Sequence, residues 1–167
     1  MQTYQTGYAE SHHIAEQIFR DILPRRGMAV REEQIARCHE VLDTLYNKEI
    51  SLCEAGVGTG KTLAYLVACI LWQMNRPEQM KLPIVISTSS VALQAAILTE
   101  YLPALSAILL DEGIITAPIT AVVRKGKERF VCDARLAERA SLVHPSRKRQ
   151  RNSLHIAENI LDMDHIP

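Results

Sequence analysis

The length, composition and charge of the chain exclude several classes of protein. It has 167 residues, of which 47% are apolar and 23% charged, and this length and composition suit one globular domain with a core. The longest uninterrupted apolar run, residues 63–72, is shorter than the roughly 18 residues that span a bilayer. The first residues lack the basic segment and apolar core of a signal peptide. We therefore predict a cytoplasmic protein with no membrane partner.

The four cysteines, Cys38, Cys53, Cys69 and Cys132, include no close pair. This spacing argues against a disulfide framework and against a self-contained zinc site. We predict four reduced thiols.

The zero net charge hides a basic segment. Residues 124–151 hold ten Lys or Arg against three acidic residues, a net charge of +7, so the remainder of the chain is at −7. A basic segment on an acidic protein suits a polyanionic partner such as nucleic acid, because phosphate contacts release counterions. A solvated face with a mobile basic tail explains the same pattern equally well.

Two amphipathic helices are predicted before the first strand. Apolar residues recur at helical spacing from Ile14 to Leu23, with Ser11 as the candidate N-cap and Pro24 ending the pattern. A second apolar stripe runs from Ile35 to Tyr46 and ends in the turn residues Asn47 and Lys48. The first helix has no motif, so it is either core or a surface for a partner.

The rest of the chain alternates between predicted strands and helices. Short apolar runs predict buried strands at 50–53, 84–88 and 119–123. Helical patterns cover about 61–74, which is apolar nearly all round, 89–102 before Pro103, and 130–142, with a weak last helix through Ile156, Ile160 and Leu161. This alternation predicts an α/β fold with a parallel sheet flanked by helices.

A glycine-rich stretch, "EAGVGTGKT" at residues 54–62, lies between the first predicted strand and the all-apolar helix. It fits the phosphate-loop pattern [A/G]xxxxGK[S/T]. Glycines let successive N–H groups approach a phosphate, the lysine supplies a mobile cation, and the threonine hydroxyl can bind Mg²⁺ at the positive end of the helix. The predicted nucleotide-binding residues are Ala55, Gly56, Val57, Gly58, Thr59, Gly60, Lys61 and Thr62, the last two also being the catalytic candidates.

The sequence around this loop resembles a helicase family. "EAGVGTGKTLAYLVACI", residues 54–70, is similar to motif I of the DinG and XPD group of superfamily 2 DNA helicases. Upstream, "REEQ", Arg31 to Gln34, resembles the RxxQ element that this group uses to recognise adenine, a role that suits an amide able to donate and accept at once. The resemblance therefore implies ATP and Mg²⁺ as cofactors and a P-loop, RecA-like fold.

Two further segments resemble the same family. "VISTSSVALQAAIL", residues 85–98, is similar to motif Ia, which implies that Ser87, Thr88, Ser89 and Gln94 contact the backbone of a DNA strand, although the serines also suit helix caps. "VVRKGKERFVCDARL", residues 122–136, resembles the entry to the iron–sulfur domain, which makes Cys132 a candidate [4Fe-4S] ligand and places Arg124, Lys125, Lys127 and Arg129 near DNA.

A cluster and a hydrolytic centre are both incomplete in this sequence. No cysteine follows Cys132, so we expect a [4Fe-4S] cluster only in a complete protein. Some CRISPR-associated DinG-like helicases lack the cluster while keeping the domain, and a small buried or idle thiol at Cys132 is the alternative. The family's DExH box is absent, and the nearest strings are "LLDEGI" (109–114) and "DMDHIP" (162–167). P-loop hydrolysis needs such a carboxylate.

We therefore predict that the chain is an N-terminal portion of a DinG-like, ATP-dependent DNA helicase and that its end at residue 167 is a truncation. The same expectations divide it into an N-terminal helical segment (1–30), an incomplete first helicase domain (31–123) and the basic start of an insertion domain (124–167). The complete protein is expected to move 5′ to 3′ on single-stranded or forked DNA, and this chain alone to be inactive. A non-catalytic nucleotide- or nucleic-acid-binding module docking on a protein or ribonucleoprotein complex, and another P-loop ATPase, are the alternatives.

Overall fold

The computed structural model describes residues 2–56, 58–77, 81–126 and 131–142. The chain divides into two compact units, Met1–Val122 and Val123–Pro167. The first unit contains the glycine-rich loop and nearly all of the described helices.

The N-terminal helix begins earlier than the sequence pattern predicts. It runs through α1 (Gln2–Gln17), a π-helical turn η1 (Ile18–Ile22) and α2 (Leu23–Arg25). Ser11 is therefore not an N-cap. It lies fully buried inside α1, where its hydroxyl bonds with the Tyr46 hydroxyl at 2.8 Å and accepts from the Asn75 side chain at 2.8 Å. These partners satisfy a polar group that would otherwise be costly to bury.

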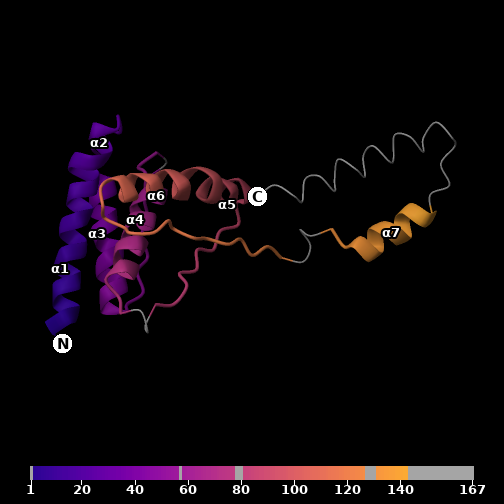
Figure 1. Cartoon of the computed structure of the whole chain (residues 1–167), viewed down its shortest axis with the longest axis horizontal. Coiled ribbons are helices and arrows are strands. Elements are labelled where there is room, and N and C mark those ends of the chain that lie inside the picture. Colours follow the sequence, from indigo (N-terminus) through magenta and orange to yellow (C-terminus); the bar gives the residue numbers. More distant parts are fainter. Residues whose placement is uncertain (1, 57, 78–80, 127–130, 143–167) are drawn as a thin grey trace. The chain divides into compact units, whose positions relative to one another are not determined.

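Helices α3 (Glu32–Asn47) and α4 (Lys61–Met74) confirm two predicted helices. The last turn of α3 closes at Lys48, whose φ of 57° is the left-handed conformation of a helix C-terminus. Figure 1 shows α1 and α3 running side by side, and α3, α4 and α1 all contact one another. The glycine-rich loop precedes α4, so this packing fixes one end of the loop.

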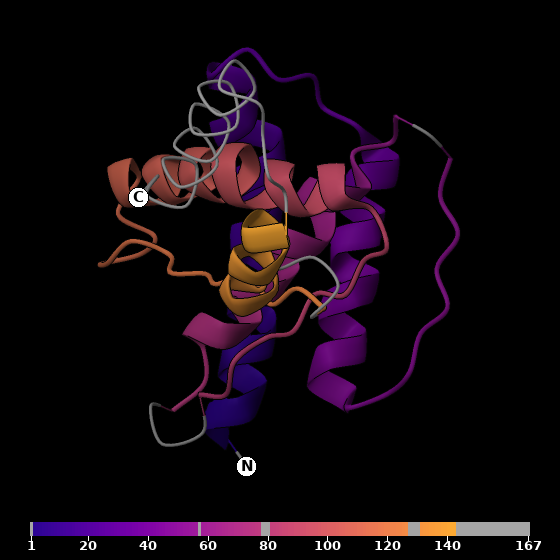
Figure 2. The ribbon, with the colours of Figure 1, turned by 90° about the vertical axis from the view of Figure 1, so that its right-hand side faces the viewer.

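A further helix runs across these three, as Figures 1 and 2 both show. It consists of α5 (Val91–Ala96), a π-helical turn η3 (Ile97–Tyr101) and α6 (Leu102–Asp111). The prediction that this helix stops before Pro103 is wrong. Proline lacks an N–H and crowds the preceding turn, and the π-helical turn directly before it changes the hydrogen-bonding pattern at that point.

The composite helix Val91–Asp111 is, by length and composition, apolar enough to cross a membrane. In this structure it contributes Ile97, Leu105 and Leu109 to the core of the first unit. The sequence pattern had missed its length because Pro103 interrupts it.

The core of the first unit is made by helices packing on helices. Its fully buried side chains include Ile18, Ile22, Leu42, Leu66 and Leu71, from the N-terminal helix, α3 and α4. Their apolar stripes interlock, so each helix covers the apolar face of another.

The predicted parallel sheet is wrong, because the described residues form no strand. In the three predicted strand segments, Ile50 and Leu52 are 96% and 97% exposed, and Val85 and Val122 are 85% and 90% exposed. An apolar run becomes a strand only when neighbouring strands pair with it and an apolar face covers it. Here the apolar stripes of α1, α3 and α4 already cover one another. Among the described residues, the three runs therefore have no neighbouring strand to pair with and no apolar face to cover them.

A polar cluster lies where α1 meets α3. The Nδ1 atoms of His12 and His39 are 2.6 Å apart in stacked rings, so one of the two rings must donate a proton to the other. His39 also contacts Glu16, and His12 lies 3.2 Å from Asp43, which accepts from the Tyr8 hydroxyl. Burial and the neighbouring His39 lower the pKa of His12. The hydrogen bond from His39, followed by that from Arg20, lowers the pKa of Glu16.

The second unit is described over residues 123–126 and 131–142. Its helix α7 (Asp133–Leu142) confirms the helix predicted at 130–142. The weak last helix through Ile156, Ile160 and Leu161 lies outside the described residues.

Candidate nucleotide-binding site

The candidate site is the loop that leads into α4. Gly58 and Gly60 have φ values of 83° and 80°, in the left-handed region that side chains with a Cβ rarely adopt. Gly60 is the N-cap of α4, and no side chain caps the helix there. The first N–H groups of an α-helix have no partner within the helix, so this end offers donors to an anion.

Helix α3 holds the loop through backbone carbonyls. The Arg31 guanidinium donates to the Gly58 carbonyl, and the Gln34 amide donates to the Gly60 carbonyl at 2.8 Å. Sequence analysis placed both residues in the nucleotide site, and the structure brings both against the loop. Gln34 is 8% exposed, and its amide nitrogen is engaged with the loop. Its recognition of adenine stays a prediction.

A side chain at Gly60 would require Gln34 to move. A Cβ on Gly60 would fall 2.0 Å from the Gln34 Nε2 and 2.7 Å from its Cδ. A Cβ on Gly58 would meet nothing within 4 Å. The two glycines are therefore required for different reasons, Gly58 by its backbone conformation alone and Gly60 also by the close approach of α3.

The Lys61 ammonium is folded back onto the loop. Its Nζ donates to the Ala55 carbonyl at 2.7 Å, and the Thr59 hydroxyl donates to the Gly56 carbonyl at 3.0 Å. Thr62 lies in the first turn of α4, next to Lys61. The structure therefore gathers the predicted loop residues around one helix end, with Val57 outside the described residues.

One residue of this site was missed by sequence analysis. Arg37, on α3, donates from Nη2 to the Glu54 carbonyl at 2.9 Å. Its position three residues after Gln34 places it on the same face of α3, and that spacing is the signal that could have revealed it.

The residues predicted to contact a DNA strand lie around the start of α5. Ser90 is the N-cap of this helix, and its hydroxyl accepts from the Leu93 N–H at 3.2 Å, which confirms that a serine caps this helix. Thr88 accepts from the Ser90 N–H at 3.1 Å, and the Gln94 side chain donates to the Thr88 carbonyl at 3.4 Å. Exposed positions are found at Ser87 and Ser89. Contact of these four residues with DNA stays a prediction.

The remaining predicted residues belong to the second unit. Arg124 and Lys125 are exposed, and Lys127 and Arg129 lie outside the described residues. Cys132 is exposed directly before α7. In the part of the chain that the structure describes, no group of three His, Cys, Asp or Glu residues is placed to hold a metal ion. Burial raises the pKa of Cys38 and raises that of Cys69 to about 11, so neither thiol is a ready ligand for iron.

The acidic residues of the string "LLDEGI" are engaged elsewhere. Glu112 forms an ion pair with Arg25 at 3.1 Å, and Asp111 forms one with Arg26 at 3.3 Å. These pairs join the end of α6 to the end of the N-terminal helix. The structure thus assigns both carboxylates to the packing of helices.

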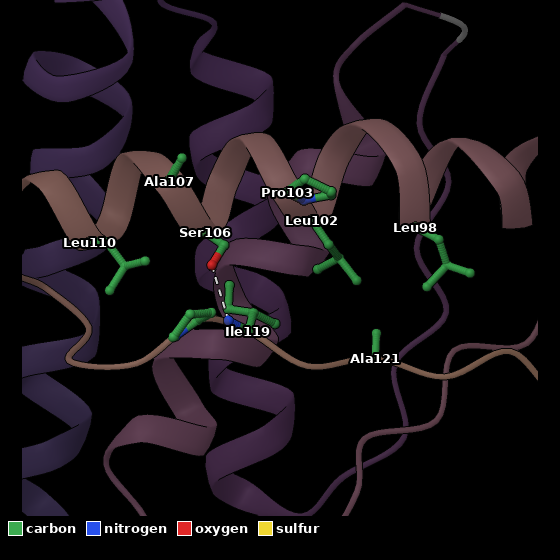
Figure 3. Close-up of a pocket in the computed structure, with 9 residues that line it drawn as sticks. Leu98, Leu102, Pro103, Ser106, Ala107, Leu110, Ile119 and Ala121 are labelled. Carbon is green, nitrogen blue, oxygen red and sulfur yellow. Dashed lines mark hydrogen bonds between the residues drawn. The ribbon is translucent and has the colours of Figure 1, made fainter. Parts of the chain in front are cut away.

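An apolar hollow of about 400 Å³ lies along α6 (Figure 3). Leu98, Leu102 and Leu110 line one side of it, and Ile119 lies opposite. Its polar side chain, Ser106, accepts from the Ile119 N–H at 3.0 Å. With that hydroxyl engaged, the hollow lacks the charged and polar groups that a nucleotide requires.

Curated relatives share the segment around the loop. The 3′-5′ exonuclease DinG of Bacillus subtilis is 33% identical over 117 residues, 70% of this chain. The chain is homologous to part of the DinG proteins. The probable ATP-dependent helicase YpvA of the same organism is 40% identical over 63 residues, 38% of this chain, and DinG of Staphylococcus aureus is 29% identical over 105 residues, 63% of this chain. The predicted resemblance is confirmed.

The chain spans about a tenth of the length of these relatives, from 10% for YpvA to 11% for the two DinG proteins. No family model matches it, and no solved structure matches it. The homology to DinG therefore concerns one segment of a much longer protein.

Proposed function

We propose that this chain forms the nucleotide-binding part of a DinG-like, ATP-dependent DNA helicase. The observation that supports this most directly is the loop 54–62 at the uncapped start of α4. Side chains of Arg31 and Gln34 hold this loop by donating hydrogen bonds to its backbone carbonyls. The named helicase relative, YpvA, matches part of the same chain. ATP and Mg²⁺ are the proposed cofactors.

The residues of the loop suit a triphosphate. When bound, Mg²⁺ would neutralise phosphate charge and would be held in part by the Thr62 hydroxyl. Lys61 would leave the Ala55 carbonyl and bind a phosphate oxygen, exchanging a neutral acceptor for a charged one. Gln34 remains the proposed adenine contact, through the part of its amide that the Gly60 carbonyl does not engage.

The DNA partner follows from the homology to DinG and from the basic segment. We propose a single-stranded or forked DNA substrate, translocation from 5′ to 3′, and contacts from Ser87, Ser89, Arg124 and Lys125. A CRISPR-associated role and a [4Fe-4S] cluster bound by Cys132 remain predictions for the longer protein. By itself, the chain is proposed to bind nucleotide without turnover.

The test is a calorimetric titration of the purified chain with Mg²⁺–ATP and with Mg²⁺–GTP. We expect binding with a preference for ATP, and a loss of about tenfold or more in Lys61→Gln, because a charged hydrogen bond to phosphate disappears. Lys48→Gln, at an exposed lysine at the end of α3, is the matched control and should bind as the parent does. Equal affinities for all three chains would refute the proposed site. Hydrolysis at helicase-like rates, abolished by Lys61→Ala, would refute the proposed lack of turnover.

A further inference from the structure

The contacts between α3 and the chain around the loop continue for another turn of the helix. Arg31 and Gln34 contact Gly58 and Gly60, and the next positions at a spacing of three residues are Arg37 and Glu40. Residues three apart lie near one face of a helix. Both of these further residues contact the segment that enters the loop.

The contacts form a connected set. Arg37 donates from Nη2 to the Glu54 carbonyl at 2.9 Å, and its Nη1 donates to the Glu40 carboxylate. The other oxygen of Glu40 accepts from the Cys53 thiol at 3.1 Å. The Arg37 side chain is 25% exposed and that of Glu40 is 45% exposed. Two consecutive residues, Cys53 and Glu54, are thus attached to one ion pair on α3.

Holding a carbonyl also aims the N–H group of the same peptide. In a planar trans peptide the C=O and the following N–H point in opposite directions. Arg37 fixes the Glu54 carbonyl on the side of α3, so the Ala55 N–H points away from α3. The Gly60 carbonyl accepts from the Gln34 amide and also from the Ala64 N–H in the first turn of α4, so the Lys61 N–H points away from both donors. The donors needed by a phosphate therefore depend on where α3 places the acceptors.

We propose that Arg37 and Glu40 are positioning residues for the nucleotide loop: they orient the Glu54–Ala55 peptide so that its N–H faces the bound phosphate. Neither residue contacts the phosphate. This inference rests on the proposed function, because it assigns to α3 the arrangement of the same site.

The test compares nucleotide affinity in Arg37→Met, Arg37→Lys and the parent chain by calorimetry with Mg²⁺–ATP. Arg37→Met keeps the length of the side chain and removes its donors, and we expect affinity to fall roughly tenfold, as for a lost hydrogen bond from a charged group. Arg37→Lys retains one cationic donor and should restore part of the loss. Arg26→Met is the matched control, because this substitution removes two ion pairs, with Asp111 and Glu112, that do not involve the loop.

A second measurement does not depend on nucleotide. In ¹⁵N-labelled apo protein, the Ala55 amide resonance should shift in Arg37→Met and in Glu40→Gln, and stay unchanged in Arg26→Met. The inference is overturned if the parent binds ATP and Arg37→Met binds it within twofold. It is also overturned if Arg37→Met lowers the melting temperature more than Arg26→Met does and Arg37→Lys restores no affinity. If the parent binds no ATP but the Ala55 resonance shifts as expected, the proposed function fails while the positioning of the peptide stands.

Discussion

Substitution of Gly60 by alanine separates two costs that the loop imposes. The residue has a φ of 80°, and an L-residue in this region costs about 1–2 kcal/mol relative to glycine. Its new Cβ would also lie 2.0 Å from the Gln34 Nε2, so Gln34 must move and lose its bond to the Gly60 carbonyl. That hydrogen bond contributes about 0.5–1.5 kcal/mol. Gly60→Ala should therefore destabilise the first unit by about 1.5–3.5 kcal/mol.

Gly58→Ala and Gly27→Ala are the matched controls. They have φ values of 83° and 86°, and a Cβ at either position would meet nothing within 4 Å. Each substitution should lower the free energy of unfolding only by the backbone contribution of about 1–2 kcal/mol. Gly58→Ala tests that contribution within the loop, and Gly27→Ala tests it away from the loop.

The assay is urea unfolding followed by circular dichroism at 222 nm, for Gly60→Ala in the parent and in a Gln34→Ala background. Truncation of Gln34 removes the atoms that the new Cβ would meet, so Gly60→Ala should cost about as much there as Gly58→Ala does in the parent. The difference between backgrounds is the coupling energy of the two positions. If Gly60→Ala costs the same in both backgrounds, the close approach of Gln34 has no energetic effect and the reasoning is refuted.

Three further predictions concern the fold. Because the folded pKa of His12 is lowered, the unfolded chain binds its proton first, so the free energy of unfolding should fall as the pH drops below about 6.5; a pH series of urea titrations should show this slope, reduced in His12→Asn. Leu71→Ala, at a fully buried site, should cost about 2–5 kcal/mol in the same assay, and Leu52→Ala, 97% exposed, less than about 0.5; similar losses would contradict the helix-on-helix core. Ellman's reagent should modify the exposed Cys53 in native protein and the buried Cys38 only after unfolding. Cys53→Ser should therefore remove one reactive thiol from the native protein, and Cys38→Ser should remove one only from the unfolded protein.

The sequence predicted α3 and α4 well because their patterns are local. The apolar stripe of α3 and the apolar composition of α4 depend on residues three and four apart, and both helices lie where expected. Ser11 misled the prediction, because a serine before an apolar stripe has the composition of an N-cap. Its partner Tyr46 lies 35 residues away, and no local pattern could indicate that pairing.

The sheet could not be predicted reliably from short apolar runs. A strand depends on partners distant in sequence, and the run at 50–53 gives no information about them. The loop itself was predicted from spacing, since glycine, lysine and threonine positions in a phosphate loop are fixed within a few residues. Arg37 was missed because its role depends on the course of the loop past α3, which only the structure supplies.

The exposed apolar segments bear on how the protein behaves in a test tube. Ile50, Leu52, Val85 and Val122 expose β-branched and leucine side chains to solvent in stretches that form neither helix nor strand. Such stretches favour association between chains, because unpaired backbone and apolar surface can be shared by two copies. The apparent molar mass from static light scattering should therefore rise with protein concentration, and replacing Leu52 and Val85 with lysine should suppress that rise without loss of helical content.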